Sequence, residues 1–559
     1  MMLSSKKTLL LSTFAFTSCP IWANVLPDAG VLLKQQQITQ PFTPQAEVNI
    51  EVPDQHQGIL LDDQQQIQVT QIIIQGNEHI SEAKLSVLTT PKVGQMLTLS
   101  DLQQLTQDIT NFYKSEGYAY TRAYLPAQNL ANGIVKIAIL EAKYDRIQVQ
   151  NNSNTSDELI QGILSPLQSG QIIETDVLQQ QLMILGRLSG VETRNVISAG
   201  RHLGTSDLTI YVEDGKKATA YVGVDNFGNE YTREWRLNAG ASAYNIFGLG
   251  DELSVNTMSS IDLNFARLNY ETMINGSGTR LGASYSYLDY DLIKEYKDLE
   301  AVGSAQQAST WVSQPVLLNN QTEVVLAAQY DFKRLEDDIR VADLYRHRDI
   351  HVGQIRLDVA QRDDFAGGGL TQFGVSSDFG YVNYKNNAAK SSDLATSNTQ
   401  GSFRTAALNL SRLQNLGDSS TQLYAELRAQ YSPDNLDSAQ QFTVGGVGSV
   451  AGYQNSALGG STGYYALAEL KQNLHHSNNH LISGKVYADT ANIKRQATTW
   501  KGLTGDNQEQ IHSVGLGLNW SHVSKLSASL VIGVPIGSKP ASLAERNSAE
   551  AWFSMNKQF

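Results

Sequence analysis

The sequence has a single cysteine, few charged residues and no long hydrophobic run. Cys19, its only cysteine, lies within residues 1–23, where Lys6 and Lys7 precede an apolar stretch and Ala23 offers a cleavage site, as in a signal peptide. Cleavage after Ala23 would leave no thiol, which excludes disulfides. Beyond residue 23 no stretch approaches the ~20 consecutive apolar residues of a transmembrane helix. The mature chain is therefore expected to be periplasmic, secreted, or an outer-membrane β-barrel.

Positive charge is also scarce, since the formal net charge is −13 and Lys and Arg form no cluster. A nucleic-acid partner is excluded, because phosphate contacts require clustered cations. Charged residues make up 17% of the chain, against about 25% in soluble proteins, while 44 Gly and 24 Tyr suit the strands of a barrel.

Motifs for catalysis are missing as well. The chain has no phosphate-binding loop, nucleophile elbow or zinc-protease helix, so no catalytic residue and no cofactor are predicted. His475, His476 and His480 could bind a metal, but no carboxylate or cysteine completes the set, and a solvated turn is favoured. No metal site is predicted. Asp337 and Asp338 resemble a carboxylate pair but are attributed to a loop.

Residues 24–66 are polar, rich in Gln and interrupted by four prolines, which is typical of a linker. Within them, Pro27–Gln37 has the pattern of a short amphipathic helix, the alternative being a flexible tether. We therefore predict a helix in 24–38 and a linker in 39–66.

Two similar α+β modules follow, at 67–143 and 144–214. Each has the predicted order β-α-α-β-β in about 75 residues, so the module is an internal repeat. In the first module, Val69–Gln75 is the opening strand, and Ser100 is the expected N-cap of the main helix, with Gln103 completing a capping box. Gly117 ends that helix.

From residue 215 to 559 the helical period disappears and short alternating strands take over. In Ser513–Trp520, apolar residues share one face and Ser, Gly and Asn the other. Alternation alone fits either a soluble sandwich or a lipid-facing barrel, but sixteen strands can be traced, an even number as in bacterial barrels. Residues 386–400 and 432–460 are the longest polar interruptions and are expected to be outer loops. The chain ends in a strand closed by Phe559, which is typical of outer-membrane proteins and serves their assembly machinery.

The first module contains the most specific motif of the chain. Gly117-Tyr118 begins a stretch that continues through Thr121 and Pro126 to Gln128. This stretch closely resembles the first polypeptide-transport-associated (POTRA) domain of the two-partner secretion transporters, the family of hemolysin activators and adhesin exporters. The resemblance extends over nearly the whole mature chain. It implies a sixteen-stranded barrel at 215–559, two POTRA domains and a plug helix at 24–38.

A second motif lies in a loop near 433–460. In the family, Val450-Ala451-Gly452-Tyr453 corresponds to the tip of an inward-folded loop, and Tyr487 and Asp489 to the matching motif on the barrel wall. The family usually has Arg where this chain has Ala451, and an Arg–Asp contact is thought to hold the loop. Ala cannot replace the planar cation, so the loop position carries over while that contact does not.

The resemblance implies an outer-membrane translocator whose POTRA domains, in the periplasm, recognise a large unfolded partner. The expected partners are a secreted adhesin, cytolysin or contact-dependent inhibition toxin, outer-membrane lipid, and the barrel assembly machinery during biogenesis. Two alternatives remain, a factor that inserts other barrels and a passive porin with periplasmic extensions.

Overall fold

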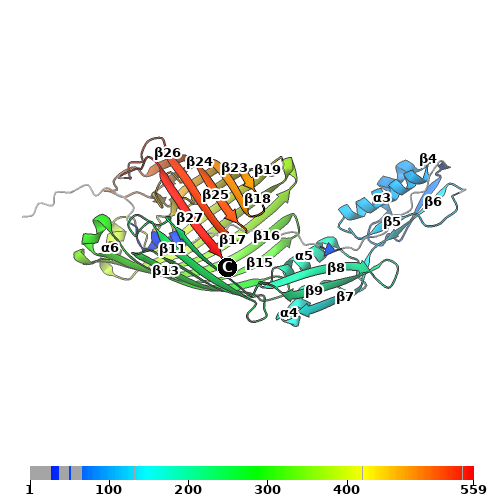
Figure 1. The fold of residues 1–559 in the computed structure, drawn as a ribbon, viewed down its shortest axis with the longest axis horizontal. Coiled ribbons are helices and arrows are strands. Elements are labelled where there is room, and N and C mark those ends of the chain that lie inside the picture. Colours follow the sequence, from blue (N-terminus) through cyan, green and yellow to red (C-terminus); the bar gives the residue numbers. More distant parts are fainter. Residues whose placement is uncertain (1–26, 37–49, 52–65, 131, 418–419, 544) are drawn as a thin grey trace, which may run out of the picture.

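The computed structural model describes residues 27–36, 50–51, 66–130, 132–417, 420–543 and 545–559. Its main feature is a closed antiparallel barrel of sixteen strands, preceded by two α+β modules that extend from one end of the barrel (Figure 1). The barrel strands are β10 (Ala218–Asp225), β11 (Arg236–Tyr244), β12 (Glu252–Ser259), β13 (Leu263–Met273), β14 (Arg280–Asp291), β15 (Ala301–Leu318), β16 (Thr322–Ile339), β17 (Leu344–Asp363), β18 (Gly369–Tyr384), β19 (Gly401–Leu416), β20 (Thr421–Tyr431), β23 (Thr462–His476), β24 (His480–Lys494), β25 (Gln508–His522), β26 (Leu526–Ile536) and β27 (Glu550–Gln558). The predicted number of strands and the barrel are confirmed.

The apolar face of the barrel strands points outward. In β25, the side chains of Val514, Leu516 and Leu518 are 40%, 57% and 46% exposed. Ser513 on the same strand is fully buried and faces the inside of the barrel. A soluble sandwich would bury the apolar face, so this inverted pattern is that of a lipid-facing barrel. In the described part of the chain, no helix has the length and apolar character needed to span a membrane.

The barrel wall has unequal height around its circumference. β16 and β17 are 18 and 20 residues long and pair along the whole of β16. At the closure, by contrast, the eight-residue β10 pairs with β27 only through Tyr221–Asp225 and Ser554–Gln558. The barrel therefore closes on its shortest ladder.

The first module is a three-stranded sheet covered by helices on one face. The sheet order is β3 (Gln71–Gln75), β6 (Ile134–Leu140) and β5 (Arg122–Tyr124), and the helices are α2 (Glu82–Thr89) and α3 (Leu99–Ser115). A separate ladder joins β2 (Ile67–Gln68) to β4 (Met96–Leu97), and a short 3-10 helix, η1, spans Thr90–Lys92. Leu102, Leu105 and Ile109 of α3 are buried against the sheet, as the helical spacing predicted.

The predicted capping box of α3 was wrong by two residues. Thr98 is the N-cap, because its hydroxyl accepts from the Asp101 N–H at 3.1 Å and the Asp101 carboxylate accepts from the Thr98 N–H at 2.8 Å. Asp101 provides a carboxylate at the third helical position, which Gln103 cannot do for an N-cap at Thr98. Ser100 lies inside the first turn.

The second module has four strands in the order β1 (Ile50–Glu51), β8 (Val191–Ala199), β9 (Thr205–Asp214) and β7 (Lys143–Asn152). Helices α4 (Asp157–Leu164) and α5 (Thr175–Gly186) cover one face. β1 comes from the segment predicted to be linker, so this sheet borrows a strand from outside its module.

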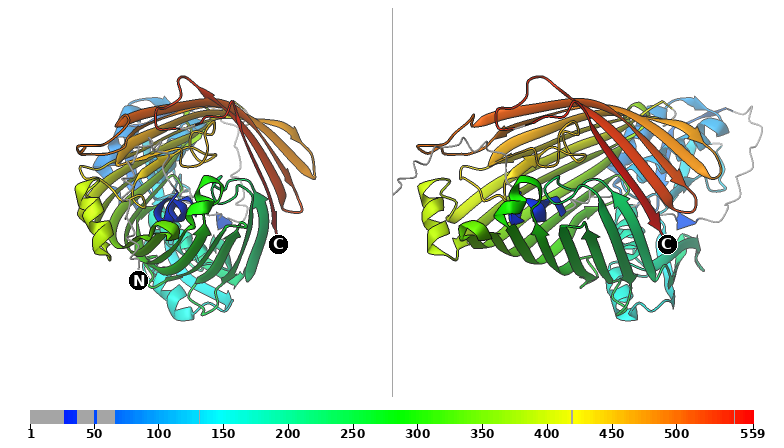
Figure 2. Two further views of the ribbon diagram at one scale, coloured as in Figure 1. Left: turned by 90° about the vertical axis from the view of Figure 1, so that its left-hand side faces the viewer. Right: turned by 60° about the vertical axis from the view of Figure 1, so that its left-hand side comes forward.

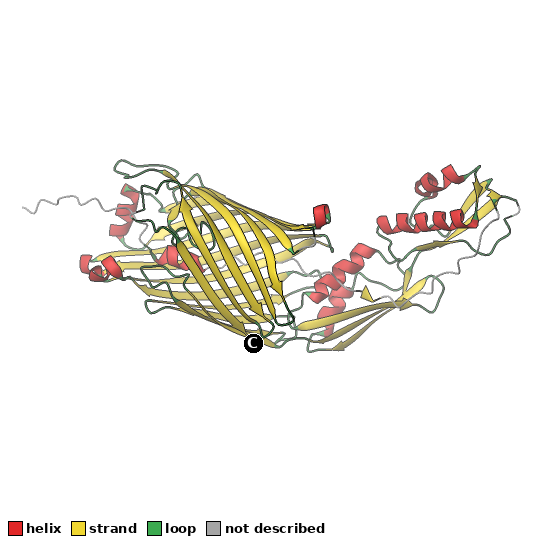
Figure 3. Ribbon diagram, turned by 45° about the horizontal axis from the view of Figure 1, so that its top comes forward, coloured by secondary structure: helices red, strands yellow, loops and turns green. Residues whose placement is uncertain are grey.

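Further short elements lie inside the barrel and at the end away from the modules. Helix α1 (Ala29–Gln36) sits in the lumen (Figure 2), and the hairpin of β21 (Phe442–Val444) and β22 (Leu458–Gly460) belongs to the loop between β20 and β23. Helix α6 (Asn387–Ala395) lies at the far end of the barrel (Figures 1 and 3), within one of the predicted polar loops. The 3-10 helices η2 (Lys294–Leu299), η3 (Arg340–Ala342) and η4 (Phe365–Gly367) complete the elements. The predicted signal peptide lies outside the described residues.

Candidate functional site

The lumen of the barrel contains a short helix, α1, whose N-terminus is held by carboxylates. The Asp28 side chain caps the helix, accepting from the Val31 N–H at 2.9 Å, and Asp337 of β16 accepts from the Ala29 N–H at 2.7 Å. Negative groups are favourable there because the first N–H groups of a helix have no partner within it. Ala29, Leu32 and Leu33 are fully or almost fully buried in an apolar cluster with side chains of the surrounding strands.

A cluster of six polar side chains, here called the plug clamp, joins α1 to the barrel wall and to the loop between β20 and β23. It consists of Asp28 before α1, Asp337 of β16, Arg346 and Arg348 of β17, and Asp437 and Ser438 of the loop.

Arg348 is the centre of the plug clamp and has no solvent exposure. Its Nε lies 2.6 Å from Asp437, its Nη1 2.6 Å from Asp337 and its Nη2 3.2 Å from Asp28. A buried guanidinium is costly unless its donors are all matched. Here one cation bridges the plug, the wall and the loop at the same time.

The rest of the plug clamp reinforces these three links. Arg346 contacts Asp28 at 3.2 Å and Asp437 at 3.3 Å, and the Ser438 hydroxyl donates to Asp28 at 2.7 Å. A Cβ on Gly30 would lie 2.6 Å from Ser438 Oγ, so the helix approaches the loop as closely as glycine allows. The attribution of Asp337 and Asp338 to a loop was wrong, because β16 continues to Ile339 and includes both residues; Asp337 accepts from Arg348 inside the barrel.

The tip of the loop between β20 and β23, Val450–Tyr453, follows Asp437 and Ser438 in the chain and lies against the barrel wall. The Ala451 N–H donates to Asp489 of β24 at 3.2 Å, and the Gly452 N–H donates to the Ser513 hydroxyl of β25 at 3.1 Å. Ser513 in turn donates to Asp489. On the other side, Trp552 of β27 donates from Nε1 to the Ala451 carbonyl at 2.8 Å.

The main chain therefore takes the place of the missing arginine. Asp489 is 5% exposed and binds the loop through a backbone N–H and the Ser513 hydroxyl. This arrangement requires very close approach, since a Cβ on Gly533 of β26 would lie 2.4 Å from the Ala451 carbonyl oxygen. Small residues on both surfaces allow the loop backbone to touch the wall.

The side chains of the tip complete this anchor. Val450 and Tyr453 are 0% and 3% exposed within an apolar cluster of loop and wall residues, and Tyr487 packs beside Ala451 and Trp552. Arg428 of β20 donates to the Gly448 carbonyl, and its guanidinium lies 4.5 Å from the centre of the Tyr465 ring. An arginine thus does hold this loop, but it projects from the wall.

The Gly117–Gln128 motif forms the joint between the two modules. Gly117, with φ of +94°, offers its carbonyl to the Thr175 N–H of α5 at 2.8 Å, and the Ala119 N–H donates to the Thr175 hydroxyl at 3.0 Å. Tyr120 packs against the core of the second module. The signature residues at its start therefore fix one module on the other.

The later residues of the motif shape the first module. Thr121 is buried, with its N–H donating to the Tyr118 carbonyl at 3.1 Å, and Pro126 follows the end of β5. The Gln128 side chain both accepts from the Lys136 N–H and donates to the Lys136 carbonyl, each at 2.7 Å. Its amide thus extends the ladder of β6 where the backbone of β5 has ended.

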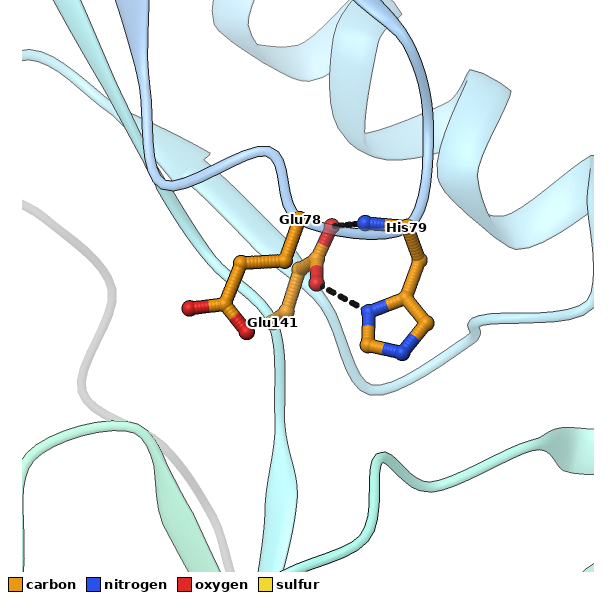
Figure 4. A group of neighbouring side chains, drawn as sticks. All are labelled: Glu78, His79 and Glu141. Carbon is orange, nitrogen blue, oxygen red and sulfur yellow. Dashed lines mark hydrogen bonds and ion pairs between the residues drawn. The ribbon is translucent and has the colours of Figure 1, made fainter.

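Near this joint, Glu78, His79 and Glu141 form the one group with metal-ligand geometry in the described ranges, with ligand atoms within 4.8 Å of one another (Figure 4). These groups already have partners, because Glu141 contacts His79 Nδ1 at 2.6 Å and accepts from Tyr113 at 2.9 Å, while Glu78 pairs with Lys143 at 2.7 Å. Burial, followed by the contact with Glu141, raises the pKa of Tyr113, so its hydroxyl stays a donor. The arrangement ties the first module to the start of β7.

Sequence reasoning missed the strand β1 in the linker. A signal was present, since Glu47-Val48-Asn49-Ile50-Glu51-Val52 alternates strictly between polar and apolar residues before Pro53. Only Ile50 and Glu51 of this stretch are among the described residues, and both pair with β8.

The remaining predicted residues lie at the end of the barrel nearer the modules. Phe559 is exposed, and its N–H donates to the Ala220 carbonyl of β10 at 2.9 Å. His475 and His476 end β23, while His480 begins β24, where it stacks on Trp520 of β25.

A closed sixteen-stranded barrel with a lumenal helix, an inward-folded loop and two docking modules defines a class, the outer-membrane transporters with POTRA domains. Within that class, the model of the haemolysin secretion/activation protein ShlB/FhaC/HecB matches residues 204–520, more than half of the chain. The model of the POTRA domain, ShlB-type, matches residues 67–142. The chain therefore belongs to the ShlB/FhaC/HecB family of two-partner secretion transporters, which export partner exoproteins across the outer membrane.

Individual relatives agree with this assignment. The chain is 27% identical to the heme/hemopexin transporter protein HuxB of Haemophilus influenzae over 95% of each chain. It is 24% identical to the outer membrane transporter CdiB of Escherichia coli, over 73% of this chain and 69% of that protein. The solved structure of CdiB from Escherichia coli superposes with a TM-score of 0.70 at 20% identity, covering 91% of this chain and 92% of that one, which shows a common fold.

Proposed function

We propose that this transporter exports one large partner polypeptide, which enters unfolded from the periplasm and leaves through the barrel. In this proposal residues 1–23 are the removed signal peptide, 24–38 the plug and 39–66 the linker. The POTRA domains at 67–143 and 144–214 capture the partner, and the barrel at 215–559 provides the pore.

The observation that carries the proposal is the position of Arg348. This buried cation joins the plug, the β16–β17 wall and the loop stem at Asp437. Opening a pore for a polypeptide requires α1 to leave the lumen, so these contacts must break during each transport cycle. The tip contacts of Ala451 and Gly452 do not involve α1 and remain in place.

Capture in the periplasm depends on main-chain recognition. An unfolded polypeptide offers the same backbone groups whatever its sequence, and the addition of a strand to a sheet edge uses those groups. Since the periplasm lacks ATP and the chain has no phosphate-binding loop, export draws on folding of the partner outside the cell. A requirement for a nucleotide-driven motor at this step would contradict the proposal.

The class of partner follows from the relatives. The relatives are named as a heme/hemopexin transporter protein, an outer membrane transporter CdiB and a hemolysin transporter protein. We propose an exoprotein of the adhesin, cytolysin or contact-dependent toxin type, and the partner to test first is a heme/hemopexin-related exoprotein, because that likeness extends over 95% of the chain.

The direct test is deletion of the gene followed by analysis of the cell surface and culture supernatant. We expect the loss of one large polypeptide, with other outer-membrane proteins intact, and its return on complementation. Broad loss of other barrels would indicate an assembly factor instead, and an unchanged profile would contradict export.

A further inference from the structure

A row of polar side chains crosses four neighbouring strands of the barrel close to the C-terminal residue, at the end nearer the modules (Figure 1). His480 of β24 lies opposite His522 of β25, which in turn lies opposite Leu526 of β26. Leu526 lies opposite Lys557 of β27. Residues directly opposite one another share a face of the sheet, so His480, His522 and Lys557, here called the rim row, point to the same side of the wall.

The rim row is on the lipid-facing side, where the apolar band ends. Leu516 and Leu518 of β25 point outward, and Trp520 and His522 follow on the same face at the period of two. Tryptophan is typical of the level at which hydrocarbon gives way to lipid headgroups. The modules extend into the periplasm from this end of the barrel. The rim row therefore lies at the headgroup level of the periplasmic leaflet.

Hydrogen bonds determine which ring nitrogen of each histidine carries the proton. Trp520 donates from Nε1 to His480 Nδ1 at 3.1 Å, and the Ser524 N–H donates to His522 Nδ1 at 3.1 Å. Nδ1 is thus an acceptor in both rings, which places the proton on Nε2. A metal ion would need the lone pair of Nε2, where this proton is bound. With ring centres 4.8 Å apart, the two histidines instead offer a pair of N–H donors.

Lys557 adds a positive charge to these donors. Its ammonium group donates to the Ser524 carbonyl in the turn that follows His522, so the charge is held beside the histidines. Lys525 is exposed in the same turn. The combination of N–H donors with an ammonium group is one that binds phosphate oxygens.

Acidic residues are absent from the sequence of this part of the wall. Residues 472–484, 511–536 and 551–559 include no Asp or Glu, although the whole chain has a net charge of −13. Carboxylates of these segments therefore neither neutralise Lys557 nor accept from the two histidines. The local charge favours an anion, and the position at the membrane surface favours one that is attached to a lipid.

We propose that the rim row binds the phosphate group of an anionic phospholipid in the periplasmic leaflet of the outer membrane. The Nε2–H groups of His480 and His522 donate to phosphate oxygens, and Lys557 balances the negative charge. The acyl chains lie along the apolar outer face of β24 to β26. This site requires only that the barrel is in a membrane, so it stands or falls independently of the proposed export function.

Lipid binding can be measured by native mass spectrometry of the purified full chain in detergent, with dioleoylphosphatidylglycerol as the probe. In His480→Ala/His522→Ala we expect binding to be at least about tenfold weaker, because two hydrogen bonds to a charged group are lost. His480→Gln/His522→Gln keeps an amide donor near each Nε2 position and should recover much of the affinity. His351→Ala is the control, since His351 is an exposed histidine of β17 that contacts Tyr330. Equal affinity of the alanine double variant and the unchanged protein would overturn the proposal.

A second variant tests the role of charge. In Lys557→Gln we expect the protein to lose its preference for dioleoylphosphatidylglycerol over the zwitterionic dioleoylphosphatidylcholine, because the ammonium group responds to the net charge of the headgroup. An unchanged preference would overturn the assigned role of Lys557. All variants should keep the heat-dependent gel mobility of a folded barrel, since the substituted side chains are not part of a buried core.

Two further titrations distinguish the ligand from its alternatives. Inorganic phosphate should compete with the lipid only weakly, because it has no acyl chains to bury against the barrel. Competition at equal concentrations would assign the site to free phosphate and overturn the proposal. Displacement of the lipid by Zn²⁺, lost in His480→Ala/His522→Ala, would assign the histidine pair to a metal and would also overturn it.

Discussion

The loop between β20 and β23 is held at two places by different chemistry. At its stem, Asp437 and Ser438 belong to the plug clamp, where side-chain charges meet around Arg348. At its tip, Ala451 and Gly452 present main-chain groups to Asp489, Ser513 and Trp552.

The charged contact at the stem can be broken reversibly, whereas the main-chain contact at the tip is close-fitting. Charged groups regain hydration when they part, so a buried ion cluster is only weakly favourable overall, although removing a single member is costly. The contact between the loop backbone and the small residues of the wall contains few charged groups that could regain hydration on separation. Its stability depends on how closely the two surfaces fit. We therefore expect the stem to open with the plug while the tip stays on the wall. Four substitutions test this comparison.

Arg348→Ala should have the largest effect. It leaves the carboxylates of Asp28, Asp337 and Asp437 buried with Arg346 as the remaining cation of the clamp, at a cost of about 3–5 kcal/mol. The plug should be released and ion conductance in planar bilayers should rise. Arg334→Ala is the control, because Arg334 pairs with Asp349 on the same two strands while half-exposed, and it should leave conductance unchanged. A closed barrel in Arg348→Ala would remove the distinction between stem and tip.

Gly452→Ala should break the tip. The new Cβ would lie 2.6 Å from Ser513 Cβ and 2.8 Å from the Pro535 nitrogen, and such overpacking costs up to about 3 kcal/mol. The loop should become accessible to added protease on whole cells. Gly448→Ala lies in the same loop with no neighbouring atom within 4 Å of its Cβ, so it is the matched control. Equal protease resistance of the two variants would argue against a close-fitting tip.

Ser513→Ala should have a smaller effect of the same kind. It removes the acceptor of the Gly452 N–H and one donor to the buried Asp489, a loss of about 1–2 kcal/mol. The thermal transition of the barrel, followed by its gel mobility, should move to lower temperature. Ser521→Ala, an exposed position on the same strand, is expected to leave the transition in place.

Trp552→Phe should have the smallest effect. The ring is kept, but the hydrogen bond to the Ala451 carbonyl is lost, which costs about 0.5–1.5 kcal/mol. Protease cleavage of the loop should be slightly faster than in the unchanged protein. Trp520→Phe is the control, because Trp520 of β25 stacks on His480 and lies close to the turn between β25 and β26, and it should not change that rate. A larger change in Trp520→Phe than in Trp552→Phe would contradict the assigned contact.

The sequence was sufficient to predict the architecture. Period-two alternation, as in Ser513–Trp520, and the repeated β-α-α-β-β order depend on local patterns that any short window displays. The plug clamp was not predictable, because Asp28, Asp337 and Asp437 meet only once the barrel has closed and its register is set. The sequence at Ala451 indicated that the Arg–Asp contact of the loop is lost. It could not show that the Ala451 N–H binds Asp489 instead, because every residue except proline has a main-chain donor. Helix α6 was also missed, in a polar segment where Asp393 organises the following turn by accepting from the N–H groups of Thr399 and Gln400.

The contact between Trp552 and the Ala451 carbonyl has a consequence for the order in which the protein is made. β27 is the last strand of the chain, and the tip also rests on β24, β25 and β26. The loop is synthesised before any of these strands, so its seat does not exist until the final residues have emerged and been inserted. The loop can therefore bind the inner wall only when the last strand of the barrel has been added. In a chain that lacks β27, the loop tip would lose its contact with Trp552.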